Sequence, residues 1–582
     1  MSRRSALIIL SLLLLVLVPT ARAQQITAEL PRDEKPITAN EKKAVDLLEK
    51  ISDQVTNLHS PGNRLRAECG IADLLWTRDE KRARALFKTA SDELVDLIAN
   101  IDFGDPEFYQ QLTWISQQRS ELVNRLAAHD PDAAISLLKA TRVAASNDPR
   151  TKWFGDMETN LELQLAGLIA RQNPARALEL ARATLSRGLS YNLINLVSQL
   201  QAKDPKAAMT LYKEIVEQIK HEDPSRNNEA ANIAWNLLWF QPPQADEDTY
   251  RDLLATLVTS ALAITPTDQN SMNMAQNIYG QLPSLMPLIE KYVPASAAPM
   301  RQWSQNVERS FDPSTRMFQE MNRIAQNGTV DDVLALAPRY PAELQVQIYQ
   351  QAAWKALASG DANRARQIVT DLVSDPAQRR QMLAQIENQL VENAINQDKI
   401  ADVRQMLSRV PQVERRVQTL VRLAATLASK GDKKGALELL NEVKTMVDAA
   451  RPGAAQVWGQ VQLAQSYASL DPDQSFTIVQ ALILKTNELA EAATVLDGFD
   501  AHYLKDGEWI TPGPNMLGNI INSLIMTLAV LARLDFDHAL AAANQIERPE
   551  LRLAADLEIA RAALQGKTNM NVPMFGRRIS IE

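Results

Sequence analysis

The sequence predicts an all-α protein built of stacked antiparallel helical hairpins that form an α-solenoid or superhelix. Glycine makes up only 19 of 582 residues, about half of the roughly 7% that is usual, whereas sheet turns and phosphate-binding loops consume glycine. Amphipathic stripes with a helical period follow one another from residue 41 onward. A turn that carries Asp, Asn or Gly, often before proline, recurs between these stripes.

The first 23 residues have the three-part layout of an export signal peptide. Two arginines precede an apolar run over residues 6–18, which is too short to span about 30 Å of hydrocarbon. The small residues Ala21 and Ala23 follow, and we expect cleavage before Gln24. The expected product is soluble and either periplasmic or extracellular. The alternative is an uncleaved membrane anchor.

Composition narrows the possible partners. The formal net charge is -8, and no block of lysine and arginine offers the cationic surface that nucleic acid or anionic membrane requires. No apolar stretch after residue 24 reaches the length of a membrane span, so no membrane insertion is expected once the signal is removed. The only cysteine, Cys69, lies in an apolar helical frame, which predicts a buried thiol.

The mature chain is expected to begin with a flexible lead-in over residues 24–40, where prolines alternate with charges. Helical repeats then follow over residues 41–243. The clearest hairpin, in residues 413–447, has two apolar stripes separated by Gly431 and Asp432. Each stripe has one face to bury and a charged face outside, and a short break between two such helices favours an antiparallel pair.

The recurring turn has a structural explanation. Asp or Asn caps the free amides at a helix start, and proline fits the first helical position because its missing N–H would have no partner there. A small residue one turn later lets the two helices of a hairpin approach closely. The capping residues that this pattern predicts are Asp130, Asn173, Asp204, Asp361, Asp471 and Asp535.

The hairpin around Gly431 resembles the tetratricopeptide repeat class. The matching positions are Leu423, Ala424 and Leu427 in the first helix and Ala436 and Leu440 in the second. Leu420 stands where the class has an aromatic residue, and no proline closes the repeat. The resemblance covers residues 328–490, within the C-terminal repeats predicted over residues 328–496, and is looser over residues 60–220. It implies a scaffold that binds peptides or proteins, and it assigns no binding residue.

Two stretches interrupt the helical rhythm. Residues 244–327 are rich in proline and methionine and are expected to form an irregular helical junction between two solenoid halves; the alternative is an adaptable apolar binding surface. Residues 497–514 concentrate glycine, proline and aromatic residues. A terminal helical hairpin is expected over residues 515–565 and an irregular tail over residues 566–582.

The segment 497–514 is the predicted partner-binding loop. It exceeds the roughly 2–8 residues that usually connect paired helices, and its aromatic content argues against simple disorder. The candidate binding residues are Phe499, His502, Tyr503 and Trp509. The alternative is that these rings hold the loop against the last hairpin and cover the exposed end of the solenoid.

No catalytic, cofactor-binding or metal-binding residues are predicted. The sequence contains no His-Glu-x-x-His, no Cys-x-x-Cys and no Walker-type phosphate loop, and its five histidines never pair at the helical spacing of a metal site. The predicted function is therefore an exported, non-enzymatic helical-repeat scaffold that binds protein or peptide partners in the cell envelope. One alternative is a secreted all-helical hydrolase that acts on polysaccharide or peptidoglycan with acids from residues 497–514. Another is a structural subunit of an envelope assembly.

Overall fold

A computed structural model describes most of the chain, and the described part is almost entirely helical. This confirms the all-α class and the solenoid of stacked hairpins. The predicted signal peptide, residues 1–23, lies outside the described residues, as does the lead-in up to residue 37. The structure describes residues 38–101, 108–142, 152–225, 227–240, 246–311, 320–321, 324, 328–396, 399–407, 413–499, 502–509, 515–565, 573–574 and 577–578.

Helices follow one another along the described chain. The first group is α1 (Ala39–Val55), α2 (Pro61–Leu75), α3 (Glu80–Ala99), α4 (Phe108–His129), α5 (Pro131–Ala140), α6 (Lys152–Ala170), α7 (Pro174–Leu185), α8 (Asn192–Gln201), α9 (Pro205–Glu222), α10 (Asn228–Phe240), α11 (Glu247–Ala263), α12 (Gln269–Tyr292), η3 (Pro294–Ser296) and α13 (Ala297–Ser310). The second group is α15 (Val330–Leu334), η4 (Ala337–Arg339), α16 (Ala342–Ala358), α17 (Ala362–Leu372), α18 (Pro376–Asn396), α19 (Ile400–Leu407), α20 (Val413–Ser429), α21 (Lys433–Asp448), α22 (Ala454–Tyr467), α23 (Pro472–Leu496), α24 (Met516–Ala532), α25 (Phe536–Ala543) and α26 (Pro549–Leu564).

Two short strand pairs complete the described secondary structure. β1 (Leu504–Lys505) pairs with β2 (Glu508–Trp509), and β3 (Pro573–Met574) pairs with β4 (Arg577–Arg578), both antiparallel. The tail, expected to be irregular, therefore contains a paired segment at its described positions. The segment 515–565, expected as one hairpin, holds the three helices α24, α25 and α26.

The recurring turn forms helix caps, as the sequence predicts. Each predicted capping side chain accepts a hydrogen bond from a backbone N–H in the first turn of its helix. The small residue four positions later is fully buried, which brings the two helices of the hairpin close together. These small residues are Ala134, Ala177, Ala208, Ala365, Ser475 and Ala539.

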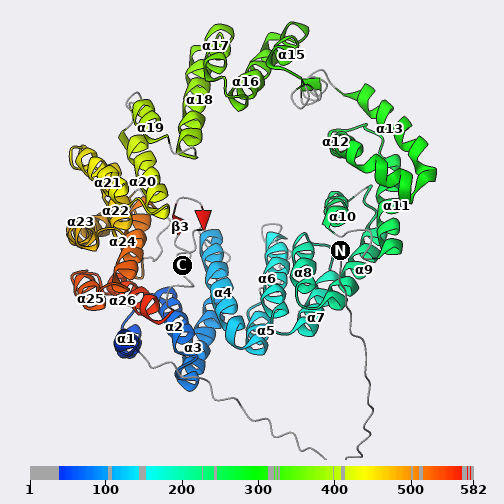
Figure 1. Ribbon diagram of the computed structural model, residues 1–582. Coiled ribbons are helices and arrows are strands. Elements are labelled where there is room, and N and C mark those ends of the chain that lie inside the picture. The colour runs from blue at the N-terminus through cyan, green and yellow to red at the C-terminus, as the bar shows by residue number, and fades with distance from the viewer. Residues whose placement is uncertain are drawn as a thin grey trace, which may run out of the picture.

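The hairpins stack with their first helices side by side. α4, α6, α8 and α10 pack in succession, as do α20, α22 and α24, while α7, α9 and α11 form the layer behind. In Figure 1, α10, α20, α22 and α24 lie on the inside of the curve, and α11, α21, α23 and α25 lie on the outside. The first helices of the hairpins therefore form the inner face of the molecule.

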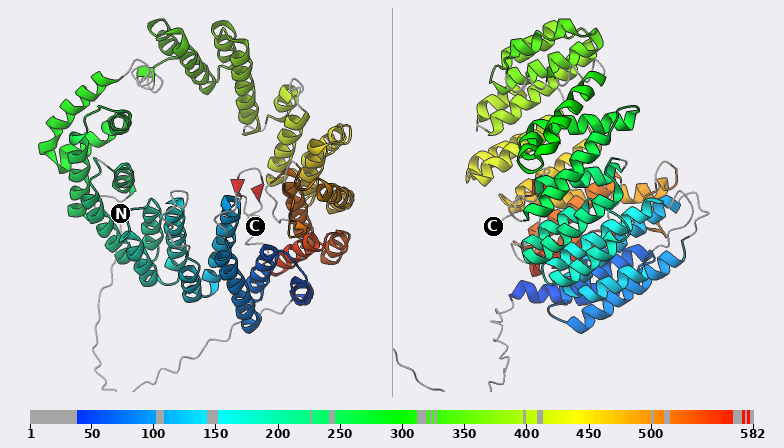
Figure 2. Two further views of the ribbon diagram at one scale, coloured as in Figure 1. Left: turned by 180° about the vertical axis from the view of Figure 1, so that it is seen from behind. Right: turned by 90° about the vertical axis from the view of Figure 1, so that its right-hand side faces the viewer.

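The solenoid closes into a ring. The last helix, α26, packs against α1 and α2 as well as against α24, and the view from behind shows the first and last helices side by side (Figure 2). α26 takes the place of an inner helix between α24 and α2, and α1 takes the outer place beside it. We call the contact of α26 with α1 and α2 the seam. The expectation of an exposed solenoid end is wrong, because the two ends cover each other.

The apolar core continues across the seam. One cluster of buried residues includes Leu48 and Ile51 of α1, Leu65 of α2 and Ile559 of α26. The same cluster extends through α11, α12 and α13 to Phe311, and separate clusters fill the repeats from α15 to α22. Along the described chain, the first change of cluster therefore falls at the end of the expected junction.

The proline- and methionine-rich part of that junction is regular. Pro283 and Pro287 lie inside the continuous helix α12. Met300 is fully buried, and Met272 and Met286 are partly buried against the same core. None of the described helices is both long and apolar enough to cross a membrane.

Candidate functional site

The four residues predicted as a partner-binding loop do not share one surface. Phe499 is 81% exposed and His502 is exposed, Tyr503 is half-buried, and Trp509 is 1% exposed. The rings of Tyr503 and Trp509 lie 5.8 Å apart between centroids. Trp509 thus belongs to the interior of the seam region. A partner-binding role for Phe499 and His502 stays a prediction.

Part of this segment is a β-hairpin. Asp506 and Gly507 join β1 to β2, and both have positive φ, 55° and 78°. Two central residues with positive φ make the type I′ turn, for which Asp-Gly is a preferred pair because glycine adopts this conformation without strain. The Asp-Gly pair is thus a hairpin signal present in the sequence, where the segment is predicted only as a loop.

The hairpin is attached to the start of α2 through Glu508. Its Oε1 accepts a hydrogen bond from the backbone N–H of His59 at 2.6 Å, and its Oε2 accepts from the N–H of Ser60 at 3.1 Å. Oε2 also accepts from Nδ2 of Asn63 at 3.1 Å. Ser60 precedes α2 but makes no capping bond with its own side chain. The buried Glu508 carboxylate supplies the negative charge that a helix N-terminus favours.

Trp509 is tied to both ends of the chain by its backbone. Its N–H donates to Oε1 of Glu550 in α26 at 2.9 Å, and its C=O accepts from Nδ2 of Asn63 in α2 at 3.0 Å. Nζ of Lys505 lies 4.3 Å from the ring centroid of Trp114 in α4. The hairpin therefore links α26 to α2 and α4 across the seam.

Two of the acids in residues 497–514, on which the hydrolase alternative depends, hold backbone groups. Oδ1 of Asp497 accepts hydrogen bonds from the N–H groups of Tyr503 at 2.5 Å and Leu504 at 3.1 Å. Glu508 is only 7% exposed and is occupied at the start of α2. Both acids act as structural acceptors that fix the path of the segment.

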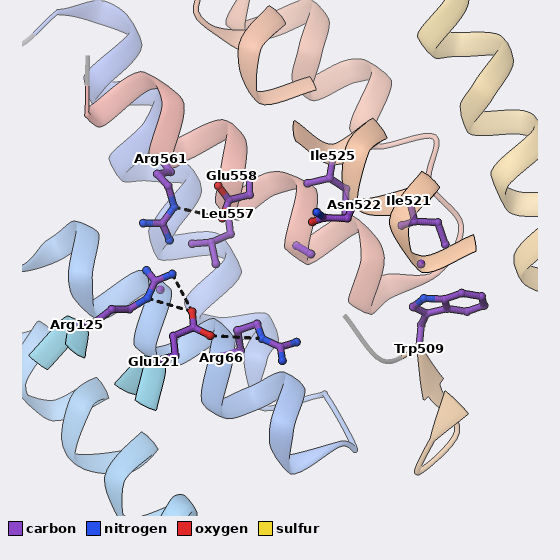
Figure 3. A pocket seen from close by; sticks show the side chains of 13 residues that line it. Arg66, Glu121, Arg125, Trp509, Ile521, Asn522, Ile525, Leu557, Glu558 and Arg561 are labelled. Carbon is purple, nitrogen blue, oxygen red and sulfur yellow. Dashed lines mark hydrogen bonds and ion pairs between the residues drawn. The ribbon is translucent and has the colours of Figure 1, made fainter. Parts of the chain in front are cut away.

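A pocket of about 270 Å³ lies beside Trp509, where the two ends of the chain meet (Figure 3). One wall is apolar and comes from the loop, α24 and α26. The other wall carries charged side chains from α2, α4 and α26. The lining residues used below are Trp509, Ile521, Ile525 and Leu557 on the apolar wall and Arg66, Glu121, Arg125, Glu558 and Arg561 on the charged wall.

Asp73 in α2 connects the charged groups behind this pocket. Its Oδ2 accepts from Nη1 of Arg125 and from Nη1 of Arg561, both at 3.1 Å, and its Oδ1 lies 2.9 Å from Nε2 of His129. Burial alone would raise the pKa of Asp73, but the hydrogen bond with His129 and the two guanidinium charges lower it. Arg561 of α26 thus reaches α2 through a carboxylate that also holds α4.

A second candidate region is a groove of about 770 Å³ on the inner face. It crosses the first helices α18, α20 and α22 and also touches α19. Nη1 of Arg415 donates to Oδ1 of Asn388 at 3.3 Å, and Arg422 forms an ion pair with Glu392. Gln418 is exposed, and Trp458 is half-buried in the lining. The groove therefore combines polar and charged side chains with one large aromatic ring.

The inner face of the N-terminal half carries amide side chains and few charges. Nδ2 of Asn195 donates to Oδ1 of Asn192 at 3.2 Å, and Nδ2 of Asn192 donates to Oδ1 of Asn160 at 2.8 Å. Each amide lies three or four positions from the next on its own helix, so the side chains form stripes. We call this surface the amide face, which consists of Asn160, Gln164, Asn192, Asn195, Gln199, Asn232 and Asn236 on α6, α8 and α10.

The described residues offer little for metal or thiol chemistry. No group of three or more His, Cys, Asp or Glu side chains in the described ranges could hold a metal ion. Cys69 is buried, as predicted, and its burial raises the pKa of the thiol well above the usual value. A neutral buried thiol packs in the core and is a poor nucleophile.

Comparison with known proteins identifies no family. No family model and no curated protein matches the chain. Among solved structures, a circular tandem repeat protein is 14% identical with a TM-score of 0.21, covering 90% of this chain and 99% of that chain. The APC/C hetero-tetramer Cut9-Hcn1 is 16% identical with a TM-score of 0.16, covering 90% and 93%. TM-scores this low do not support any inference about the function of this chain.

Proposed function

We propose that the chain is an exported, non-enzymatic scaffold that binds extended polypeptide segments along the inner face of its helical ring, within the cell envelope. A helical-repeat fold is typical of protein-binding scaffolds, because the stacked first helices present one extended surface. The observation that carries the proposal is the groove across α18, α20 and α22, which gathers side chains from three successive hairpins and carries exposed polar groups from α18 and α20.

The groove suits a partner that lies across several helices. Arg415 and Gln418 are exposed in it, and Trp458 supplies an apolar surface with a polar N–H. Its volume of about 770 Å³ exceeds what one side chain fills. An extended segment that places successive side chains along the groove would contact all three hairpins.

The amide face supports the same kind of partner. A carboxamide carries both a donor and an acceptor, which matches the N–H and C=O of a peptide group. Asn195 and Gln199 on α8 and Asn232 and Asn236 on α10 are exposed. Such side chains can hold the main chain of a polypeptide with little dependence on its sequence.

Paired substitutions on the inner and outer faces test this function. Arg415→Ala with Gln418→Ala removes exposed groups of the groove, whereas Lys434→Ala with Glu438→Ala removes exposed groups of the outer helix α21. We expect the inner pair to lose peptides that the mature protein binds on an array made from envelope proteins, and the outer pair to keep them. Equal binding by both variants would place the partner surface elsewhere.

Export is tested separately by mass. The apolar run over residues 6–18 and the small residues before Gln24 motivate the expectation of a mature chain that begins at Gln24. Intact-mass measurement of the protein recovered from the envelope should give the mass of residues 24–582. Recovery of the full chain in a membrane fraction would contradict the export proposal and would leave the peptide-binding test untouched.

A further inference from the structure

The seam pocket combines features that point to a small ligand. Its walls come from α2 and α4 at one end of the chain and from the loop, α24 and α26 at the other. A volume of about 270 Å³ is sufficient for a few water molecules or a small organic compound. Its apolar wall and its charged wall face each other across the same space (Figure 3).

The hydrogen bonds of the charged wall indicate the charge of a ligand that would fit there. Oε1 of Glu121 accepts two hydrogen bonds from Arg125, at 2.9 and 3.1 Å, and Oε1 of Glu558 accepts from Nε of Arg561 at 3.2 Å. Nη1 of Arg561 is bound to Asp73. Nη2 of Arg561 is buried and donates to no acceptor in the described part of the chain. Nη2 of Arg561 is a donor, so the ligand group that would match it is an acceptor.

Arg66 supports an anionic ligand as well. Its Nε lies 4.0 Å from Oε2 of Glu121, so the two side chains form an ion pair at the edge of the pocket. Burial is the largest influence on Arg66, and it lowers the pKa of this guanidinium although the charge of Glu121 opposes the shift. A buried cation of this kind gains from a further negative charge nearby.

The apolar wall defines the rest of the ligand. Ile521 and Ile525 lie one turn apart on α24, with Ile521 near the ring of Trp509, and Leu557 lies on α26 nearer the charged wall (Figure 3). The side chains of Ile521, Ile525, Leu557 and Trp509 are almost fully buried. A short hydrocarbon group can cover this wall without placing any polar atom against it.

We propose that the seam pocket binds a small amphipathic monoanion, a carboxylate on a short apolar chain, and thereby strengthens ring closure. The carboxylate accepts a hydrogen bond from Arg561, the guanidinium of Arg66 adds a positive charge nearby, and the chain lies against Ile521, Ile525 and Leu557. Because the pocket is built from both ends of the protein, a ligand bound there stabilises the closed seam relative to an open one. A free organic acid and the C-terminus of a peptide share this chemistry.

Calorimetric titration of the mature protein tests the proposal. We expect hexanoate to bind and to raise the melting temperature. We expect hexanol and hexylamine to bind with an affinity lower by roughly tenfold or more, because each lacks the charge-assisted hydrogen bond of the carboxylate. N-acetyl-leucine serves as the arm for a peptide C-terminus: if it binds more tightly than hexanoate, the natural source is a peptide. Absence of hexanoate binding, or tighter binding of hexylamine, would overturn the proposal.

Two substitutions with matched controls separate binding from folding. Asn522 lines the pocket but is exposed, so Asn522→Glu adds a repelling carboxylate without disturbing the core, and Asn522→Gln is its control. We expect Asn522→Glu to weaken hexanoate binding by roughly tenfold and Asn522→Gln to leave it unchanged.

Arg561→Lys keeps the charge but loses the guanidinium fork, so it should weaken hexanoate binding. Arg301→Lys, on an exposed arginine of α13, should not. Unchanged affinity in both Asn522→Glu and Arg561→Lys would exclude this pocket.

Discussion

Trp509 shows how one residue can be chemically suited to binding and still serve packing. Its ring is 1% exposed and lies in the apolar wall of the seam pocket. Its N–H and C=O are bonded to Glu550 and Asn63, at opposite ends of the chain. Because the ring is almost fully buried, a large partner cannot contact it while the seam is closed.

Truncation of Trp509 should therefore act on stability. Trp509→Ala removes a fully buried ring, and we expect a loss of about 3–5 kcal/mol of unfolding free energy with a clear fall in melting temperature. Phe499→Ala in the same segment is the control, because Phe499 is 81% exposed and exposed substitutions change stability by about 0.5 kcal/mol or less. Thermal melts followed by circular dichroism compare the two. Equal melting temperatures would contradict the packing role.

Glu68 in α2 makes the folding stability of the molecule depend on pH. Burial and the nearby charge of Glu93 raise its pKa to about 7, and its Oε2 is buried with no hydrogen-bond partner in the described part of the chain. The pKa in the unfolded chain is close to 4.5, so the folded state holds the proton more tightly. The stability that this group contributes is full below about pH 4.5 and is lost as the pH rises through about 7.

Glu68→Gln removes this titration. At pH 8 we expect the variant to be more stable than the wild type by roughly 2–3 kcal/mol, and at pH 5 we expect the difference to be much smaller. Urea unfolding at the two pH values measures it. Glu41→Gln, on a partly exposed residue of α1 whose pKa is lowered by its cap hydrogen bonds, should show no gain at pH 8. A gain for Glu68→Gln that is equal at both pH values would mean that packing, and not charge, is responsible.

Single residues were predictable from the sequence where their role is local. The caps Asp130 and Asp204 depend on the next three residues only, and the buried Cys69 depends on its own helical frame. The burial of Trp509 depends on α24 and α26 and on Asn63, which is 446 residues away. No neighbouring residue in the sequence carries that information.

At the scale of elements, turn chemistry decides what can be predicted. Helix starts follow from an Asp or Asn cap with a buried small residue four positions later, and the structure has them where the sequence predicts them. The β1–β2 hairpin also has a local signal, Asp506 and Gly507 with positive φ. The attachment of this hairpin to α2 has no local signal in the sequence. Glutamate is usually exposed, and Glu508 meets the backbone of His59 only because the ring closes.

Glu508 should control how firmly the hairpin holds the start of α2. Glu508→Ala leaves the N–H groups of His59 and Ser60 without their acceptor, and each buried donor left unsatisfied costs about 1–3 kcal/mol. We expect a lower melting temperature and faster hydrogen exchange at the amides of His59 and Ser60. Asp506→Asn is the control, because Asn tolerates the left-handed conformation of this exposed turn. Unchanged exchange at these amides in Glu508→Ala would refute the attachment.

At the scale of the whole molecule, ring closure is the feature that could not be predicted from the sequence. Amphipathic stripes predict that hairpins stack, but every stacking contact in an open solenoid is between neighbours in the chain. The seam joins α26 to α1, and the apolar stripe of α1 looks like that of any other hairpin. Closure depends on the summed curvature of all the repeats, which no single repeat specifies.

One indirect sign of closure is present in the composition of α26. Its apolar residues face all directions: Leu551, Leu553, Leu557, Ile559 and Leu564 are all buried. A helix that is apolar all round is surrounded by protein, whereas the last helix of an open solenoid leaves one side to water. In the ring, α1, α2, α24 and α25 cover α26.

Spin labels across the seam test closure directly. Nζ of Lys43 in α1 lies 2.5 Å from Oδ2 of Asp537 in α25, although the two residues are 494 positions apart, and both side chains are largely exposed. Labels on Lys43→Cys and Asp537→Cys, in a chain whose buried Cys69 is replaced by alanine, should therefore lie close together. We expect strong dipolar broadening of the spectrum in the closed ring.

A label pair across the ring separates closure from general compactness. Arg364 on α17 is partly exposed and lies far from α1 (Figure 1), so labels on Lys43→Cys and Arg364→Cys should give no broadening. Ile559→Asp places a charge in the apolar core of α26 at the seam, and an uncompensated buried charge is strongly destabilising. This substitution should abolish the broadening between positions 43 and 537 while most of the helical signal remains. A narrow spectrum for that pair in the otherwise unchanged protein, with full helical content, would mean that the solenoid is open in solution.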